Sequence, residues 1–205
     1  MSETAAKKIK EDRTVCDTMT MKNRIIWVDC EMTGLDFDRD HLLEIACMIT
    51  EGDENLTAVA EGPNLIIHQP DSVLDSMGEW CSRTYGESGL TKAVRESKID
   101  LQETDRQLLE FVQKHTPSNT CPLAGNSIFS DKIFIAKYLP NFFSHLHYRM
   151  IDVSSIKELS RRWYPLQFDK APAKRLTHRA MDDIKESITE LRYYKETIFV
   201  KGSDN

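Results

Sequence analysis

A short apolar run near the start of the chain ends directly in two acidic residues. Ile25–Val28 is followed by Asp29 and Glu31. The run predicts a β-strand, and side chains two positions apart on a strand project from the same face. Both carboxylates can therefore meet one ion. We expect this strand to be central in a sheet, where ligands gather beyond the carboxyl ends of the strands.

Further acidic and imidazole groups follow in two distant segments. Asp131 ends the sequence AGNSIFSD, and His178 and Asp183 lie in THRAMDDI. Oxygen-rich, sulfur-free ligand sets suit Mg²⁺ or Mn²⁺ better than zinc, and three or four carboxylates can hold two such ions roughly 3.5–4 Å apart. Phosphate-ester hydrolysis is the chemistry that such a pair of ions serves best.

In that chemistry, a water loses a proton and attacks phosphorus while negative charge builds on the phosphate oxygens. We expect Asp29 to be the central bridging ligand. Glu31, Asp131 and Asp183 would complete the coordination of the two ions. His178 would be the general base, since histidine is the residue type that exchanges protons near neutral pH.

The spacing within THRAMDDI bears on where His178 lies. On an unbroken helix, His178 would face Asp182, four residues later, rather than Asp183. We therefore expect His178 to precede the helix, with Thr177 as its cap. Asp182 as the ligand remains an alternative. Taken singly, each of these residues has an ordinary explanation, such as a strand end, an early helical position or a surface histidine; the complete ordered set favours a site.

Length and composition bound the remaining possibilities. The chain has 205 residues, which is enough for one well-cored domain. We expect a disordered leader over 1–22, one folded domain over 23–200 and a frayed tail over 201–205. The net charge of −6 argues against a grip on long nucleic acid through many phosphates. Basic stretches at 145–149 and 160–165 could still contact a short polyanion.

The cysteines and the leader bear on the compartment. Five widely spaced cysteines without a CxxC pair suggest neither a disulfide framework nor a zinc site. A reducing compartment fits best, and secretion does not. The first 20 residues mix acidic and basic side chains, unlike an organelle transit peptide. We therefore expect a cytoplasmic protein, with mitochondria and the nucleus left open because Met19 and Met21 are alternative starts.

Apolar periodicity predicts an α/β domain with a mixed sheet flanked by helices. The expected strands cover 24–30, 41–50, 56–68, 122–125 and 149–153. Helical spacing covers 71–116, the segment around Asp131, 154–163 and 177–198. Asp100, with Glu103 three residues later, predicts a helix start.

At this point the motifs resemble those of the oligoribonucleases, a family of DEDDh exonucleases with a ribonuclease H-like fold. DCEMTGLD at 29–36, AGNSIFSD at 124–131 and HRAMDDI at 178–184 are similar to the three exonuclease motifs of that family. VLDSMGEWC at 73–81 and HYRMIDVSSIKELSRRW at 147–163 extend the likeness to about residues 23–200. The resemblance implies a five-stranded mixed sheet and two-metal, 3′-to-5′ hydrolysis of very short RNA to nucleoside 5′-monophosphates.

The same resemblance implies roles at the substrate. Leu35 would wedge against the bases and Trp80 would pack the substrate. A cap on the 5′ phosphate would measure substrate length. The residues implied for this cap are Ser127, Arg149 and Ser154. Tyr148 would reach into the site of a partner subunit, which implies a homodimer, and the aromatic-rich stretch 142–148 offers apolar surface for it.

Alternatives remain open for these residues and for the activity. Trp80 stands at helical spacing with Leu74 and Met77, so it could be a core residue, and Leu35 and Tyr148 could be ordinary packing residues. Cys30 replaces the leucine common in the family, and we expect it to be buried on the opposite strand face from the carboxylates. The rival functions are trimming of longer DNA or RNA ends and a non-catalytic binding module.

Overall fold

Five strands form the centre of the molecule. The structure is a computed structural model, and it describes residues 21–175 and 177–199. The strands are β1 (Ile25–Met32), β2 (Leu42–Thr50), β3 (Ala58–Ile66), β4 (Leu123–Gly125) and β5 (Met150–Asp152). Their order in the sheet is β3-β2-β1-β4-β5. β2 pairs antiparallel with both β1 and β3, whereas β4 pairs parallel with β1 and β5. The predicted mixed sheet with the first strand at its centre is confirmed.

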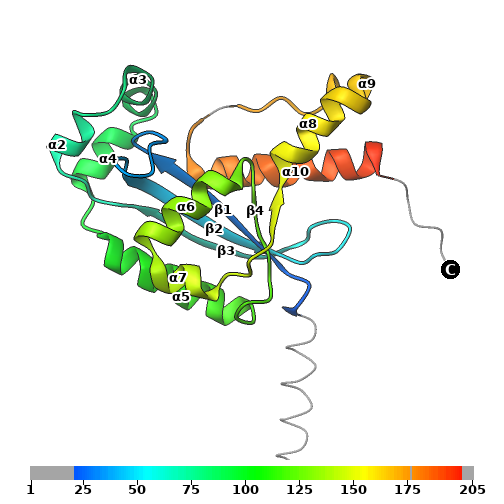
Figure 1. Cartoon of the computed structure of the whole chain (residues 1–205), viewed down its shortest axis with the longest axis horizontal. Helices are drawn as coiled ribbons and strands as arrows, with labels where there is room; N and C mark the ends of the chain where they lie inside the picture. The colour runs from blue at the N-terminus through cyan, green and yellow to red at the C-terminus, as the bar shows by residue number, and fades with distance from the viewer. Residues whose placement is uncertain (1–20, 176, 200–205) are drawn as a thin grey trace, which may run out of the picture.

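Helices cover both faces of this sheet (Figure 1). The first group is α2 (Asp71–Leu74), α3 (Glu79–Glu87), α4 (Leu90–Glu96) and α5 (Leu101–His115). The second group is α6 (Ile128–Tyr138), α7 (Pro140–His145), α8 (Val153–Trp163), α9 (Pro165–Phe168) and α10 (Ala180–Ile198). Apolar residues of α5, α6 and α7 fill the core on one face. α8 and α10 pack on the other face. α2, α3 and α4 gather at the end of the sheet toward which β1 points (Figure 1).

The two faces of β1 divide between the two cores. Ile26, Val28 and Cys30 belong to the cluster that includes α5 and α6, whereas Ile25 and Trp27 pack with α10. The alternation of a strand carries Asp29 and Glu31 onto the α10 face. Cys30 is therefore buried on the opposite face from the carboxylates, as predicted.

Local signals account for most element boundaries. Asp100 caps α5, where its side chain accepts a hydrogen bond from the N–H of Glu103, and this prediction is confirmed. α7 and α9 were not predicted, although Pro140 and Pro165 stand at their first positions, where proline favours a helix start. The last helix begins at Ala180, three residues later than expected.

The predicted leader and tail fall almost wholly outside the described residues, which begin at 21 and end at 199. Those two expectations therefore remain predictions. Within the described part of the chain, none of the helices combines the length and the apolar character that a membrane crossing requires.

Candidate active site

Asp29 and Glu31 lie inside β1, near its carboxyl end. The expectation that they lie beyond the strand is wrong by a few residues, because β1 continues to Met32. Glu31 is buried, and its Oε2 accepts a hydrogen bond from the Tyr85 hydroxyl at 2.9 Å. The same hydroxyl lies 3.0 Å from the carbonyl of Met32. Tyr85 of α3 thus fixes the orientation of one carboxylate, a role with no signal in the local sequence.

Asp131 reaches the same strand from the opposite layer. It stands in the first turn of α6 and is buried. Its Oδ1 accepts a hydrogen bond from the backbone N–H of Cys30 at 2.9 Å. That N–H lies between Asp29 and Glu31 in the chain, so Asp131 is held directly beside both.

His178 and Asp183 arrive from the start of α10. Ligand atoms of Glu31, His178 and Asp183 all lie within 4.8 Å of one another. His178 precedes the helix, as predicted, and its backbone is left-handed with φ 50°. Thr177 is not the cap, however, because Arg179 occupies that position without a side-chain cap bond. The structure brings Asp183, rather than its neighbour in the motif, to Glu31.

Asp182 points to different partners. Its Oδ2 accepts a hydrogen bond from the Thr177 hydroxyl at 3.3 Å, and its Oδ1 lies 3.8 Å from a guanidinium nitrogen of Arg175. Both partners belong to the loop that leads into α10. Asp182 therefore secures that loop, which counts against the alternative that it is the metal ligand.

The carboxylates perturb one another strongly. Burial raises the pKa of Asp29 well above its ordinary value, and the charges of Asp131, Glu31 and Asp183 add to the rise. Burial raises the pKa of Glu31 from 4.5 to about 7, against the opposing effect of the Tyr85 hydrogen bond. Burial also raises the pKa of Asp131 to about 7. Such groups hold protons in common near neutral pH unless a cation replaces those protons.

This donor set fits a divalent cation. Four carboxylates meet here, and the opposing positive charge that acts on them comes from Lys174, which lowers the pKa of Asp29 and Asp183, and from His178, which lowers that of Asp183. The donors are oxygens and one imidazole, and the thiol of Cys30 faces the other core. That chemistry suits Mg²⁺ or Mn²⁺. The residues that could hold metal are Asp29, Glu31, Asp131 and Asp183.

Trp80 stands at the edge of this cluster. Its ring meets the His178 ring edge-on, with centroids 5.2 Å apart, and lies 6.3 Å from the Tyr85 ring. Trp80 is 52% exposed and Leu35 is 68% exposed. The alternative that Trp80 is a core residue is therefore wrong. Leu35 lies in the loop directly after β1, with its side chain largely open to solvent.

Two of the predicted phosphate-cap residues also meet. The hydroxyls of Ser127 and Ser154 lie 3.2 Å apart. Asp152 joins their backbones, because its Oδ1 accepts hydrogen bonds from the N–H of Ser127 at 3.0 Å and of Ser154 at 2.9 Å. Asn126 accepts a hydrogen bond from the Ser154 hydroxyl at 3.2 Å. The sequence analysis missed Asp152 and Asn126, although an aspartate two residues before a serine at a helix start is a capping pattern.

Arg149 and Tyr148 stand apart from these serines. Both are exposed, and the Arg149 guanidinium lies 5.4 Å from the centre of the Tyr148 ring. Across residues 21–175 and 177–199, the Arg149 side chain makes no hydrogen bond or ion pair. The structure therefore does not join Arg149 to Ser127 and Ser154. Tyr148 is 71% exposed, so the alternative that it is an ordinary packing residue is wrong.

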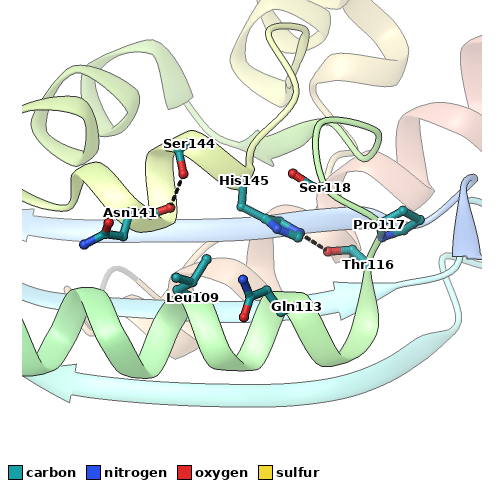
Figure 2. Close-up of a pocket in the computed structure, with 8 residues that line it drawn as sticks. All are labelled: Leu109, Gln113, Thr116, Pro117, Ser118, Asn141, Ser144 and His145. Atoms are coloured by element: carbon teal, nitrogen blue, oxygen red, sulfur yellow. Dashed lines mark hydrogen bonds between the residues drawn. The ribbon is translucent and has the colours of Figure 1, made fainter.

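A hollow of about 360 Å³ lies elsewhere, between α5 and α7. Figure 2 shows its lining, in which the Thr116 hydroxyl and the His145 ring are hydrogen-bonded at 2.9 Å. None of the predicted site residues lines it. This hollow is therefore separate from the candidate active site, which consists of the carboxylates, His178 and the side chains around them.

With this geometry in place, the chain can be compared with known proteins. A sequence model described as exonuclease matches residues 26–191. The human protein described as mitochondrial oligoribonuclease is 56% identical over 90% of this chain and 77% of its own length. The chain belongs to the oligoribonucleases, within the exonuclease family. The oligoribonuclease of Rhodococcus jostii is 49% identical, over 88% of this chain and 90% of its own.

Solved structures place the oligoribonuclease family within a wider fold. Exonuclease I from Methylocaldum szegediense superimposes with a TM-score of 0.65 at 20% identity. The match covers 85% of this chain and 41% of that one. At this identity the likeness shows the fold alone, which is ribonuclease H-like, as predicted.

Proposed function

We propose that this chain is a metal-dependent 3′-to-5′ exoribonuclease that hydrolyses very short RNA, down to dinucleotides, to nucleoside 5′-monophosphates. The observation that carries the proposal is the convergence of Glu31, His178 and Asp183 within 4.8 Å beside Asp29, in a chain with oligoribonuclease relatives. Intact acidic residues at every motif position favour catalysis over a binding module. The acidic net charge of −6 favours short substrates over long ones.

The cofactors in this proposal are two divalent ions, Mg²⁺ or Mn²⁺. The residues that would hold them are Asp29, Glu31, Asp131 and Asp183. When bound, the ions activate the attacking water and offset charge on the phosphate oxygens. Tyr85 keeps Glu31 oriented through its 2.9 Å hydrogen bond, so this ligand needs little rearrangement.

His178 is the proposed general base. It stands outside α10 and next to Glu31 and Asp183, so its imidazole can accept the proton of a water held at the carboxylates. The Trp80 ring lies perpendicular to the His178 ring, with centroids 5.2 Å apart. The ring of His178, which would accept the proton, therefore lies between the carboxylate cluster and an exposed aromatic surface.

That aromatic surface suits the substrate. Trp80 and Leu35 would contact bases without demanding a sequence, because every base has an apolar face. At the other end, the proposed 5′-phosphate cap consists of Ser127, Ser154 and Arg149. The paired serine hydroxyls are preorganised by Asp152. The Arg149 side chain would have to move away from Tyr148 to join them. Its guanidinium would then make a charge-assisted contact to the phosphate.

A second copy of the chain completes the proposal. We propose a homodimer in which Tyr148 of each subunit enters the partner's site, supported by the exposed, unburied ring of Tyr148. The compartment we propose is the cytoplasm, with the nucleus and mitochondria as alternatives. The human relative carries mitochondrial in its name, which makes mitochondria the first alternative to test by fractionation.

The test is hydrolysis of a 5′-phosphorylated RNA dinucleotide by the wild-type chain, Asp29→Ala and His178→Ala. Products would be identified by mass in Mg²⁺, Mn²⁺ or chelator. We expect nucleoside 5′-monophosphates from the wild type with metal. Asp29→Ala should be inactive, and His178→Ala should bind substrate but turn over slowly. Activity in chelator, or a wild-type rate in either variant, would contradict the mechanism.

A further inference from the structure

The residue that follows the proposed base forms an ion pair with a fully buried carboxylate. Glu44 of β2 is 0% exposed, and its carboxylate receives two hydrogen bonds from Arg179. The Nε of Arg179 lies 3.0 Å from Oε2, and its Nη2 lies 3.1 Å from Oε1. This two-point geometry is the rigid form of an arginine–carboxylate contact, and it fixes both direction and distance.

The pair connects two parts of the site that the sequence keeps far apart. Glu44 stands opposite Glu31 in the β1–β2 ladder. Arg179 directly follows His178 and is the cap residue of α10. The ion pair therefore ties the backbone beside the base to the strand beside a proposed metal ligand.

The backbone of His178 needs such a tie. Its φ of 50° is left-handed, a conformation that is unfavourable for a residue with a side chain and persists only where the surroundings enforce it. The start of α10 has no side-chain cap bond, so the usual way of fixing a helix start is missing here. The Arg179–Glu44 contact instead fixes the start of α10.

We propose that the Glu44–Arg179 ion pair positions His178 for proton abstraction. Arg179 is thus a positioning residue and Glu44 its anchor; neither needs to touch the substrate. This inference rests on the proposed base role of His178. It also gives a role to the fully buried carboxylate in β2, since placing such a carboxylate in an ion pair contributes little net stability compared with apolar side chains of the same volume.

Another ion pair provides a matched control. Lys185, also on α10, lies 2.8 Å from Glu61 of β3, and both side chains are about half-exposed. It links the same helix to the same sheet, away from His178. A general loosening of α10 should therefore be reproduced by Lys185→Met, whereas loss of base positioning should not.

The experiment compares kcat and KM of Arg179→Lys, Arg179→Met and Lys185→Met on the RNA dinucleotide in saturating Mg²⁺, below each variant's melting temperature. We expect Arg179→Met to lower kcat about 10- to 100-fold, the scale of a small misplacement of a catalytic group, with KM nearly unchanged. Arg179→Lys should fall between, because an ammonium keeps the charge but not the two-point contact. Lys185→Met should match the wild type.

A second readout separates positioning from metal binding. The rise in melting temperature on adding Mg²⁺ or Mn²⁺ should be retained in Arg179→Met, because its carboxylates are untouched. If that variant does not fold, Glu44→Met combined with Arg179→Met removes both charges together. The folded double variant should show the same low kcat.

Two outcomes would overturn the ion-pair inference: a folded Arg179→Met or double variant with wild-type kcat, or a metal-induced stabilisation lost together with activity. In both cases His178→Ala would still be impaired. A wild-type rate in His178→Ala itself would instead contradict the proposed function, so the two failures are distinguishable.

Discussion

The indole of Trp80 meets the imidazole of His178 edge-on, with ring centroids 5.2 Å apart and planes at 87°. One residue comes from α3 and the other from the loop before α10, so the contact exists only in the folded chain. Trp80 remains 52% exposed. The pair thus places an open aromatic face next to the proposed base, where the last base of a substrate would stack.

Removal of that aromatic face should weaken substrate binding. Stacking of a base on an aromatic ring contributes about 1–3 kcal/mol, so we expect Trp80→Ala to raise KM for the dinucleotide about tenfold or more. Trp80→Phe should retain most of the affinity. Steady-state kinetics of the two variants and the wild type would check this. An unchanged KM in Trp80→Ala would show that Trp80 is not a substrate contact.

Neutralising the central carboxylate should stabilise the protein while inactivating it. Burial raises the pKa of Asp29, and the charges of Asp131, Glu31 and Asp183 add to the rise. Both costs of a charge at this position disappear in Asp29→Asn. We expect the chelator-treated variant to melt about 2–4 °C higher than the wild type, equivalent to roughly 1 kcal/mol in a domain of this size. Its stabilisation by Mg²⁺ should be largely lost. Calorimetry would test this, and a variant less stable than the wild type in chelator would argue against a strained acidic cluster.

The burial of Glu31, with smaller contributions from nearby carboxylates, predicts that stability depends on pH. The pKa of Glu31 rises from 4.5 to about 7 on folding, so the folded state holds this proton more tightly than the unfolded state does. The contribution to stability is complete below pH 4.5 and is lost as the pH rises through about 7. In chelator, raising the pH from 5 to 8 should lower the free energy of unfolding of the wild type by on the order of 1–3 kcal/mol more than that of Glu31→Gln. Urea unfolding at both pH values measures it; parallel losses in the two proteins would refute it.

Asp152 offers a test of the phosphate cap. Its carboxylate accepts hydrogen bonds from the backbone N–H groups of both Ser127 and Ser154. Asp152→Ala should therefore disorganise the cap without removing the serine hydroxyls. We expect the preference for a 5′-phosphorylated dinucleotide over its 5′-hydroxyl form to fall about tenfold, the effect of losing one charge-assisted contact. Arg149→Ala should have a similar effect. If both variants keep the wild-type preference, the 5′ phosphate is recognised elsewhere.

The shared site can be tested by mixing subunits. Tyr148→Ala and Asp29→Ala should each be nearly inactive alone. If Tyr148 acts in the partner's site, a mixed dimer contains one intact site, and activity should appear on mixing. Light scattering at micromolar concentration should give the mass of a dimer. A monomeric mass, or no activity after exchange, would contradict the dimer proposal.

The sequence predicted the sheet well because its strands are short apolar runs with clear turns between them. It also predicted that His178 precedes α10, because the spacing to Asp183 does not fit one helical face. The start of α10 was placed too early because Thr177 is a good cap by type, yet its hydroxyl bonds Asp182. The hydroxyl that would have capped the helix is thus used by a residue five positions later in the chain.

Other parts of the site depend on contacts that no spacing encodes. Tyr85 reaches Glu31 from a helix at the end of the sheet, and Arg179 reaches Glu44 across 135 positions of sequence. Neither pair follows a helical or strand period. Such contacts become visible only when the fold brings their elements together, which is why the sequence indicated the proposed reacting groups but not the residues that hold them.

Hydrolysis of very short RNA by metal-dependent exonuclease chemistry is the activity proposed for this chain. The most direct measurement is hydrolysis of a 5′-labelled RNA series from two to twenty nucleotides with Mg²⁺, Mn²⁺ or chelator, resolved on a gel. We predict metal-dependent loss of the shortest members first. Equal cleavage at every length would contradict the short-substrate claim and favour an enzyme that trims longer ends, and no cleavage with either metal would contradict catalysis itself.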